Sequence, residues 1–409
     1  MTGAPHCQGC GVALVHTLVD LGRMPLANSF VEEGTPEPDA SYPLHARVCG
    51  RCLLVQVEPA VPPEAIFSDY AYFSSFSEGW LAHARAYARM AIDRFALSSA
   101  SKVVEIASND GYLLTNFVAA GIPCLGIEPA ANVAQAAVAK GVPTEVAFFG
   151  TNTARRLAAE GHSADLLAAK NVLAHVPDIN DFVAGVAILL RGEGVFTVEF
   201  PHVLNLIREV QFDTIYHEHF TYLSLAAVER ILERHALRVF DAEEIPTHGG
   251  SLRLYICHAG SQRPVQLNVA ALRAKEAAAK LDRLDGYAGF APRVDKVRSD
   301  LMAFLDAAKA EGRNVAAYGA AAKGNTLLNF CGIGRDRVAF VVDRNPAKQG
   351  RLLPGSRIPV RTPEAIQAEK PDYVLILPWN LKDEVSRQNS SVREWGGRFV
   401  TAIPEICVS

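Results

Sequence analysis

The sequence predicts an α/β protein in which a small N-terminal module precedes two Rossmann-like domains. Two Cys-x-x-Cys pairs lie within the first 52 residues, residues 101–200 alternate strand-like and helix-like segments, and a second alternation of this kind occupies residues 314–406. Such alternation is typical of βαβ units on a parallel sheet. At 409 residues the chain has the length of two to three domains. We place them at residues 1–68, 69–260 and 261–409.

The composition is that of an ordinary globular protein. Hydrophobic residues make up 49% of the chain, charged residues 21%, and the net charge is -4. This surface lacks the bulk positive charge that attracts nucleic acid or anionic membranes. The chain has neither a leader-like start nor an apolar run of about 18 residues. We therefore expect a cytoplasmic protein that binds no nucleic acid and no membrane. Because no heptad or apolar stripe is evident, we expect a monomer.

The N-terminal module carries a metal-ligand pattern formed by Cys7, Cys10, Cys49 and Cys52. Each Cys-x-x-Cys lets a tight turn direct two thiolates at one ion, and two such turns complete a closed tetrahedral zinc site that stabilises a small, irregular segment. The alternative is a redox-active pair, but these pairs lie outside any βαβ context. We predict structural zinc here and reduced thiols at the other four cysteines.

Two helical stretches are predicted between these blocks. Residues 80–97 place apolar side chains at helical spacing without Gly or Pro. A longer stretch covers residues 266–310 and is interrupted near residues 286–292. We expect the first helix to face a core.

The first α/β block opens with a turn suited to a nucleotide-like ligand. In VVEIASNDGYLL, residues 103–114, a strand ends in a turn of small residues that opens a helix. Backbone amides are available there. Glu128 ends the next strand and can accept hydrogen bonds from an adenosine ribose. This pattern fits NAD and S-adenosylmethionine alike. However, the turn lacks Gly-x-Gly-x-x-Gly, and Glu105 would repel a pyrophosphate, which favours the cationic S-adenosylmethionine.

The run YHEHFTYLS, residues 216–224, concentrates polar rings. In an extended strand, His217 and His219 would share one face and Glu218 would take the other. Two histidines and a carboxylate can ligate iron or zinc, and a histidine with a pKa of about 6.5 can also accept a proton near neutral pH. The run lacks the i, i+4 spacing of a helical metal site. From these residues alone, three interpretations of the run remain: a metal site, a catalytic base, or a polar loop. Tyr222 is expected to be a packing residue.

The second α/β block begins with a strand, a turn and a helix in AYGAAAKGNTLLN, residues 317–329. Lys323 lies in this turn, and a cation beside helix-terminal amides suits a pyrophosphate. Upstream, His248 precedes two glycines and offers a polar ring on flexible backbone. Asp343 stands where a dinucleotide-binding domain has its ribose-binding acid. It raises the alternative of an NAD-dependent oxidoreductase or epimerase. A non-enzymatic zinc-ribbon scaffold is a third class, but it leaves these turns and acids unexplained.

Several unusual motifs occur together in one order: EIASNDG, AKNVLAHV, VEFPH, YHEHFTYLS, PTHGGSLR, AYGAAAKGNTLLN and VVDRNPAKQG. In this combination the chain resembles the sugar C-methyltransferases of dTDP-deoxysugar biosynthesis, in particular the C-3′-methyltransferase group of tetronitrose-type branched sugars. The resemblance covers essentially the whole chain, including the four cysteines. It implies methyl transfer from S-adenosylmethionine to a carbon of a dTDP-linked 4-keto-deoxyhexose, as in actinomycete antibiotics. One departure is that Ala107 and Asn109 stand where glycines are commoner in methyltransferases.

The implied reaction requires a base and no metal. A carbon beside a ketone becomes a nucleophile only after it loses a proton, so the enzyme needs a base, a donor near the enolate oxygen and a methyl group held in line. The resemblance assigns the base to His219, with Tyr216 and Glu218 at the same site, and implicates Tyr70. His175 lies at the carboxyl edge of a parallel strand, where α/β sites form. C-3 is the expected carbon, and C-5 is the alternative.

The two ligand sites complete these expectations. The methyl-donor site is expected to comprise Glu105, Ala107, Asn109, Gly111, Glu128 and Asn171. The dTDP-sugar site is expected to include His248, Lys323 and Asn325, with the active site between the two α/β domains.

Overall fold

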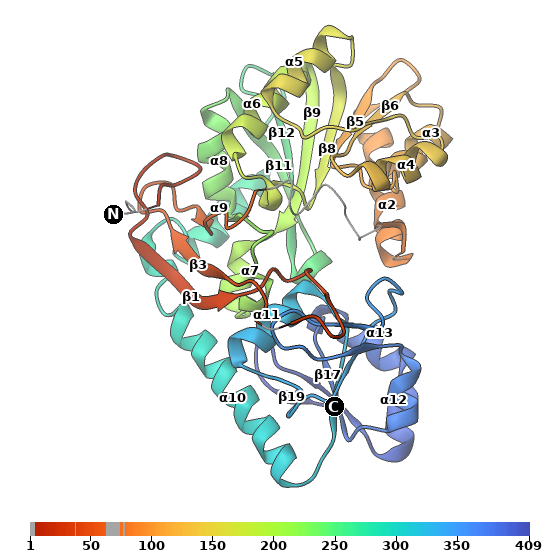
Figure 1. Cartoon of the computed structure of the whole chain (residues 1–409). Coiled ribbons are helices and arrows are strands. Elements are labelled where there is room, and N and C mark those ends of the chain that lie inside the picture. The colour runs from red at the N-terminus through yellow and green to blue at the C-terminus, as the bar shows by residue number, and fades with distance from the viewer. Residues whose placement is uncertain (1–4, 37, 63–73, 77) are drawn as a thin grey trace.

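A computed structural model describes residues 5–36, 38–62, 74–76 and 78–409 of the chain (Figure 1). Three larger sheets of four, seven and six strands organise it, together with a two-stranded ribbon. The expected alternation of strands and helices is present in both α/β parts. Within the described residues, no helix combines the length and apolar character needed to cross a membrane.

The N-terminal module is richer in strands than its irregular sequence suggests. Its sheet, in the order β1-β3-β4-β10, contains β1 (His16–Met24), β3 (Tyr42–Val48), β4 (Val55–Gln56) and β10 (Thr221–Tyr222). In β3 every second residue is buried, because the pleat turns alternate side chains to the core. β10 pairs antiparallel with β4, although more than 150 residues separate them in sequence. The module is therefore continuous with the segment that follows His219.

The central sheet has the order β11-β12-β9-β8-β5-β6-β7. Strands β5 to β9 run parallel, and β12 pairs antiparallel with β9 and β11. The strands are β5 (Val103–Ile106), β6 (Cys124–Ile127), β7 (Thr144–Glu145), β8 (Ala164–Lys170), β9 (Leu190–Pro201), β11 (Leu237–Ile245) and β12 (Ser251–His258). The order reverses direction between β5 and β8, and ligands of open α/β sheets bind beyond the carboxyl ends at such a point.

Helices cover both faces of the central sheet because its strands are buried on both sides. One face packs against α2, α3 and α4, and the other against α5, α6, α8 and α9. The helices are α2 (Glu78–Phe95), α3 (Leu114–Ala119), α4 (Ala131–Ala139), α5 (Thr151–Ala159), α6 (Ile179–Leu189), α7 (Val203–Arg208), α8 (Leu225–Glu233) and α9 (Leu267–Ala278). Although the expected boundary at residue 261 assigns α9 to the C-terminal part, α9 packs on β11 and α8.

The C-terminal sheet has the order β16-β14-β13-β17-β18-β19, with only β19 antiparallel to its neighbour. Its strands are β13 (Val315–Tyr318), β14 (Val341–Val342), β16 (Val360–Arg361), β17 (Tyr373–Ile376), β18 (Arg398–Thr401) and β19 (Cys407–Val408). Its helices are α10 (Phe290–Ala310), α11 (Ala322–Cys331), α12 (Glu364–Glu369) and α13 (Lys382–Gln388). Helices α9 and α10 confirm the interrupted stretch predicted from the sequence.

Short 3-10 helices complete the chain between these elements. They are η1 (Ser74–Phe76), η2 (Leu173–His175), η3 (Phe212–Thr214), η4 (Thr247–Gly249), η5 (Leu284–Gly286), η6 (Trp379–Leu381) and η7 (Ser390–Trp395). η2 and η4 adjoin strands of the central sheet, η3 precedes β10, and all three carry candidate site residues.

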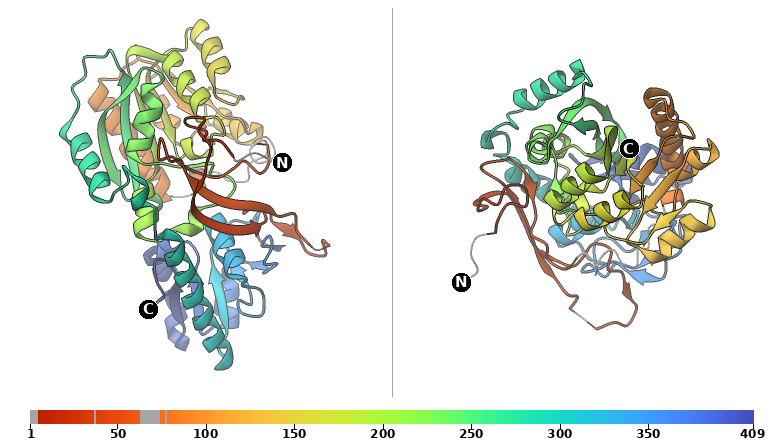
Figure 2. Two further views of the ribbon diagram at one scale, coloured as in Figure 1. Left: turned by 90° about the vertical axis from the view of Figure 1, so that its left-hand side faces the viewer. Right: turned by 90° about the horizontal axis from the view of Figure 1, so that it is seen from above.

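A segment of the N-terminal module crosses onto the C-terminal part, and we call residues 25–36 and 38–40 the strap. Within it, β2 (Val31–Glu32) pairs antiparallel with β15 (Arg351–Leu352). The Asp39 carboxylate forms a salt bridge with Arg357, and both side chains are largely buried. β1 and β3 run beside the junction of the two α/β parts (Figures 1 and 2). One apolar core joins this module to the C-terminal sheet.

Candidate active site

The four N-terminal cysteines converge as expected. Their Sγ atoms all lie within 4.8 Å of one another, and the Cys7–Cys52 and Cys10–Cys49 pairs are each 3.4 Å apart. Tetrahedral zinc with bonds of about 2.3 Å places its sulfurs about 3.8 Å apart, so the cluster fits one ion. Gln56 donates from Nε2 to Cys7 Sγ at 3.2 Å. Across the described ranges, this is the one group of three or more His, Cys, Asp or Glu residues spaced for a metal.

Residues 107–111, which we call the donor turn, connect β5 to the helix that begins at Leu114. Ala107, Asn109 and Gly111 have φ values of 52°, 50° and 76°. The left-handed region normally favours glycine, so the chain adopts a glycine-type turn with alanine and asparagine in it. Space at Gly111 is also tight, because a Cβ would lie 3.0 Å from Val142 Cγ2.

Glu128 closes the donor turn from the end of β6. Its Oε2 accepts from the Asn109 amide and its Oε1 from the Ala130 amide, each at 2.9 Å. Burial raises the pKa of this carboxyl, and the two amides act in the opposite direction. A carboxylate oxygen has further lone pairs, so Glu128 can still accept from ribose hydroxyls.

Two features of the donor turn were not visible in the sequence. Gly126 in β6 packs directly against it, because a Cβ there would lie 2.3 Å from Ser108 Oγ. Ser74 and Ser75, which precede α2, also hold the turn. The Ser74 amide donates to Asn109 Oδ1 at 2.8 Å, and the Ser75 hydroxyl donates to the Asp110 carboxylate. A glycine within a strand was the one available signal.

The run at residues 216–219, which we call the histidine turn, is not an extended strand. The His219 amide donates to the Tyr216 carbonyl at 2.9 Å, which closes a turn through His217 and Glu218. His217 and His219 therefore do not share a face. The His217 ring contacts Tyr42 and lies 3.2 Å from the Pro43 carbonyl, whereas His219 faces Thr214. The strand geometry considered for this run was wrong because the turn hydrogen bond bends it.

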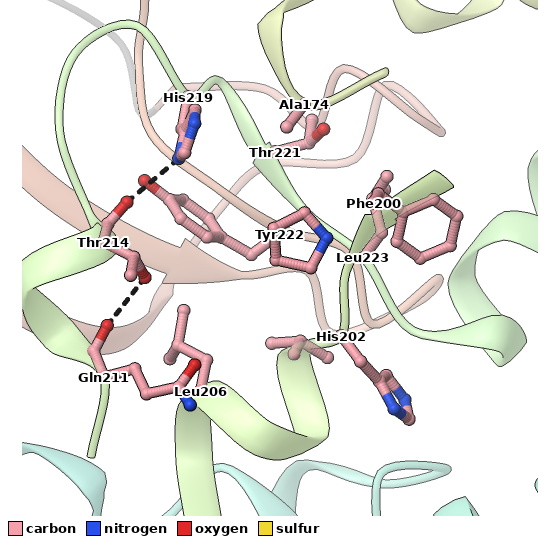
Figure 3. A pocket seen from close by; sticks show the side chains of 12 residues that line it. Ala174, Phe200, His202, Leu206, Gln211, Thr214, His219, Thr221, Tyr222 and Leu223 are labelled. Atoms are coloured by element: carbon pink, nitrogen blue, oxygen red, sulfur yellow. Dashed lines mark hydrogen bonds between the residues drawn. The ribbon is translucent and has the colours of Figure 1, made fainter. Parts of the chain in front are cut away.

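Both ring nitrogens of His219 have partners. Nδ1 lies 3.0 Å from the Thr214 carbonyl and Nε2 lies 2.8 Å from the Tyr216 hydroxyl (Figure 3 shows the first contact). A carbonyl only accepts, so Nδ1 carries the proton and Nε2 is the basic nitrogen. Burial, with His175 nearby, lowers the pKa of His219 well below 6.5, which keeps the ring neutral.

A small cavity of about 20 Å³ lies beside His219, walled by Thr214, Leu206, Tyr222 and Leu223 (Figure 3). This volume accommodates about one water molecule. Tyr222 is buried as expected, at 6% exposure. The cavity borders the base but is too small for a sugar.

His175 lies beside His219 on η2, just beyond the carboxyl end of β8. The two rings are 4.6 Å apart, and His175 Nδ1 donates to the Glu218 carbonyl at 2.8 Å. Burial lowers the pKa of His175 to about 4. The Glu218 carboxylate points instead to the strap, where it accepts from Asn28 Nδ2 at 2.6 Å. Burial raises the pKa of Glu218 to about 7. Tyr70 lies outside the described residues.

Asn171 and His248 meet at the carboxyl end of β8. Asn171 Nδ2 lies 3.0 Å from His248 Nε2, and the His248 ring packs against Trp80 of α2 with ring centroids 5.2 Å apart and the ring planes tilted by 31°. Both residues have positive φ, at 54° and 55°. The backbone is therefore held in a strained form at both positions, as is common at functional sites.

Lys323 and Asn325 on α11 have different surroundings. Lys323 Nζ donates to Asn380 Oδ1 at 2.7 Å and lies 4.5 Å from the Trp379 ring. The side chain of Asn325 is instead buried at 1% exposure, and its Nδ2 donates to the Ala27 carbonyl of the strap at 2.5 Å. The structure thus places Asn325 as a support of the strap.

Asp213 is a further buried acid that the sequence did not single out. It lies on η3, and its Oδ2 accepts from Trp379 Nε1 at 2.8 Å. The positive charge of Lys323 favours the ionised form of its carboxyl group. Burial raises the pKa of Asp213 to about 6. Asp213 and Lys323 are therefore a pair of interacting ionisable side chains where the central and C-terminal parts meet.

Asp343 is engaged within its own domain. Its Oδ2 accepts from the Ala320 amide and its Oδ1 from the Asn345 amide, each at 2.8 Å, and Lys348 Nζ lies 3.7 Å away. The carboxylate thus stabilises the β13–α11 turn, with a lysine beside it.

Comparisons with known proteins cover nearly the whole chain. Family models match residues 7–67 as a zinc binding domain, residues 80–241 as a methyltransferase domain and residues 246–404 as a C-methyltransferase C-terminal domain. The C-methyltransferase NovU of Streptomyces niveus is 36% identical over 401 residues, which span 98% of this chain and 96% of that protein. The chain belongs to the C-methyltransferase family. It is an S-adenosylmethionine-dependent enzyme with a zinc-binding N-terminal module.

Two solved methyltransferases each resemble less than half of the length of this C-methyltransferase. A magnesium protoporphyrin IX methyltransferase from Synechocystis is 14% identical and covers 44% of this chain and 80% of its own, at a TM-score of 0.34. An S-adenosylmethionine-dependent methyltransferase from Clostridium acetobutylicum is 12% identical and covers 43% and 91%, at a TM-score of 0.35. These values are too low to carry any inference about the site.

The residues of the C-methyltransferase fit its cofactor. Glu105 is fully buried, and among the described residues no hydrogen bond of standard geometry reaches either carboxylate oxygen, although Tyr112 is near enough to influence its pKa. Burial raises the pKa of Glu105 well above its usual range, while Lys170 and Tyr112 act in the opposite direction. An ammonium group of the cofactor would satisfy this acid, and Glu128 would meet the ribose.

Proposed function

We propose that this C-methyltransferase transfers the methyl group to C-3′ of a dTDP-linked 4-keto-deoxyhexose, including one with a 3-amino group, in antibiotic deoxysugar biosynthesis. The observation that carries the proposal is the neutral, largely buried His219, whose Nδ1 proton is held by the Thr214 carbonyl. This arrangement leaves Nε2 as the base for a carbon acid. We further propose that the protein is monomeric and cytoplasmic.

The histidine turn supplies the acid–base groups. His219 Nε2 removes the proton from the carbon next to the ketone. The Tyr216 hydroxyl donates to Nε2 at 2.8 Å before the reaction, and as Nε2 becomes protonated this hydroxyl proton is released to the developing enolate oxygen. A base whose pKa is depressed remains unprotonated at neutral pH. His175 and Glu218 position the turn, since His175 Nδ1 bonds its Glu218 carbonyl.

When bound, S-adenosylmethionine supplies an electrophilic methyl group on a sulfonium centre. Glu105 would hold its ammonium group and Glu128 its ribose hydroxyls, and the donor turn and Asn171 would contact it at the carboxyl ends of β5 and β8. Alignment of the carbon nucleophile with the methyl group then supplies much of the rate enhancement.

Lys323 binds the diphosphate of the sugar nucleotide, and the neighbouring Asp213 favours the charged form of this lysine. Burial lowers the pKa of Lys323, with Asp213 acting in the opposite direction. A diphosphate would provide this lysine with a strong acceptor, and His248 flanks the same region through its contact with Asn171. We propose that residues 1–68, 69–260 and 261–409 hold zinc, methyl donor and sugar nucleotide, respectively.

His219→Asn tests the base. Because general-base catalysis contributes about 10²- to 10⁴-fold, methylation of a dTDP-4-keto-deoxyhexose should fall by that factor. Calorimetric binding of S-adenosylhomocysteine should remain, since the donor turn is untouched. Near-normal turnover would remove His219 as the base.

Deuterium exchange distinguishes C-3 from C-5. In deuterium oxide with S-adenosylhomocysteine in place of the donor, wild-type enzyme should exchange the C-3 proton of the ketosugar, as followed by NMR. Exchange at C-5 instead would favour the alternative reaction, C-5 methylation of a dTDP-4-keto-6-deoxyhexose.

The second alternative, an NAD-dependent oxidoreductase or epimerase, is disfavoured by the match of residues 246–404, which include Asp343, to a C-methyltransferase C-terminal domain. Absorbance change with NAD and the sugar nucleotide would revive that alternative.

A further inference from the structure

We propose that the N-terminal module is part of the active site, and that its Asn28 is a positioning residue for the histidine turn, acting through the Glu218 carboxylate. This inference rests on the proposed function of that turn. It gives the module a role in catalysis in addition to binding zinc.

The contact itself joins two segments that are 190 residues apart. Asn28 Nδ2 donates to Glu218 Oε1 at 2.6 Å, and Glu218 is only 4% exposed. A hydrogen bond from an amide to a buried carboxylate is stronger than one between neutral groups. The contact therefore fixes one side of the turn that carries His219.

The strap is held firmly enough to serve as an anchor. The Ala27 carbonyl, next to Asn28, accepts from the buried Asn325 amide at 2.5 Å. Further along, β2 pairs with β15, and Arg357 binds Asp39. These contacts attach the strap to the C-terminal part on both sides of Phe30, which lies 5.4 Å from Lys348 Nζ.

The same module supports the other end of the turn. Thr221 and Tyr222, directly after Phe220, pair with β4 as strand β10. The Val57 amide donates to the Phe220 carbonyl at 3.0 Å. The histidine turn is thus held by the N-terminal module at Glu218 and again just beyond His219.

The charged and titratable groups around Glu218 come from all three parts of the chain. Burial raises the pKa of Glu218, whereas the hydrogen bond from Asn28 and the charge of Lys348, which lies in the C-terminal part, lower it. His175 bonds its backbone carbonyl, and His217 and His219 are its neighbours in the turn. Loss of the Asn28 amide should leave the carboxylate less stabilised and less fixed in position.

Asn28→Leu removes the amide donor with little change in shape, and Asn28→Ala removes the side chain. A lost hydrogen bond to a buried carboxylate corresponds to a rise of about one pH unit in the pKa of Glu218. We would follow that pKa by NMR with carbon-13-labelled glutamate, assigning the resonance by its absence in Glu218→Gln. Turnover should fall about tenfold or more, with the KM for S-adenosylmethionine unchanged.

Ser29→Ala is the matched control, because Ser29 is exposed in the strap as Asn28 is, whereas the hydrogen bond to Glu218 comes from Asn28. It should retain the wild-type titration and turnover. A titration midpoint unchanged in both Asn28 variants would overturn the proposal, as would unchanged turnover. The titration does not depend on the methyl acceptor, so it reports on the contact even if the proposed sugar substrate is wrong.

Discussion

Gly126→Ala should distort the donor turn and weaken cofactor binding. An added Cβ at residue 126 would lie 2.3 Å from Ser108 Oγ, 2.9 Å from Ser108 Cβ and 3.1 Å from Thr144 Oγ1. Ser108 is fully buried and cannot turn outward. The conflict must therefore move either β6 or the donor turn itself.

Overpacking of this kind costs about 1–3 kcal/mol. In a domain of the central part's size, that cost corresponds to a fall in melting temperature of roughly 2–12 °C. If about 1.4 kcal/mol of it falls on the bound state, the Kd for S-adenosylhomocysteine rises about tenfold. Differential scanning calorimetry and isothermal titration calorimetry measure the two effects separately.

A double-mutant cycle identifies the cause. Ser108→Gly removes both atoms of the closest conflict, so it should recover part of the stability and affinity lost in Gly126→Ala. If the free-energy changes of the two single variants add up to that of the double variant, the reasoning is refuted, because substitutions of residues in contact are expected to couple. Wild-type melting and affinity in Gly126→Ala would refute it directly.

The remaining predictions concern the metal and pH. Cys49→Ser should lose bound zinc and lower the melting temperature, because a closed thiolate site contributes its binding free energy to folding; elemental analysis should find unchanged zinc in Cys124→Ser, which lies outside the cluster. The rate of methylation should rise with pH through about 7, where Glu218 ionises and binds Asn28 more strongly. Glu218→Gln should lack this rise, whereas a persisting rise in its pH profile would exclude Glu218 as its source.

Local patterns in the sequence were sufficient for the separate elements. Two Cys-x-x-Cys turns predicted the cluster, and apolar spacing predicted α2 and the broken helix of α9 and α10. Motif resemblance predicted the family and brought His175, Tyr216 and His219 together. These features depend on neighbours in sequence or on motifs kept in order.

Contacts between distant segments were not predictable in this way. The role of Asp213 depends on its hydrogen bond with Trp379, and the role of Asn28 depends on its hydrogen bond with Glu218. The histidine turn was also beyond local reasoning, because its residues suit a strand equally well and the hydrogen bond from His219 to Tyr216 decides between them. Asn325 was expected to bind substrate, but a strap that folds back from residue 27 covers it.

The shared sheet has a consequence for biosynthesis of the chain on the ribosome. β1, β3 and β4 emerge early, yet their fourth strand, β10, is made only at residues 221–222, and the partner of β2 only at residues 351–352. Pairings so far apart in sequence slow folding, since long loops must close before the contacts form. The strands β1 to β4, although synthesised before their partners, are therefore among the last to reach their final structure, and the active site is complete only when the C-terminal sheet is present.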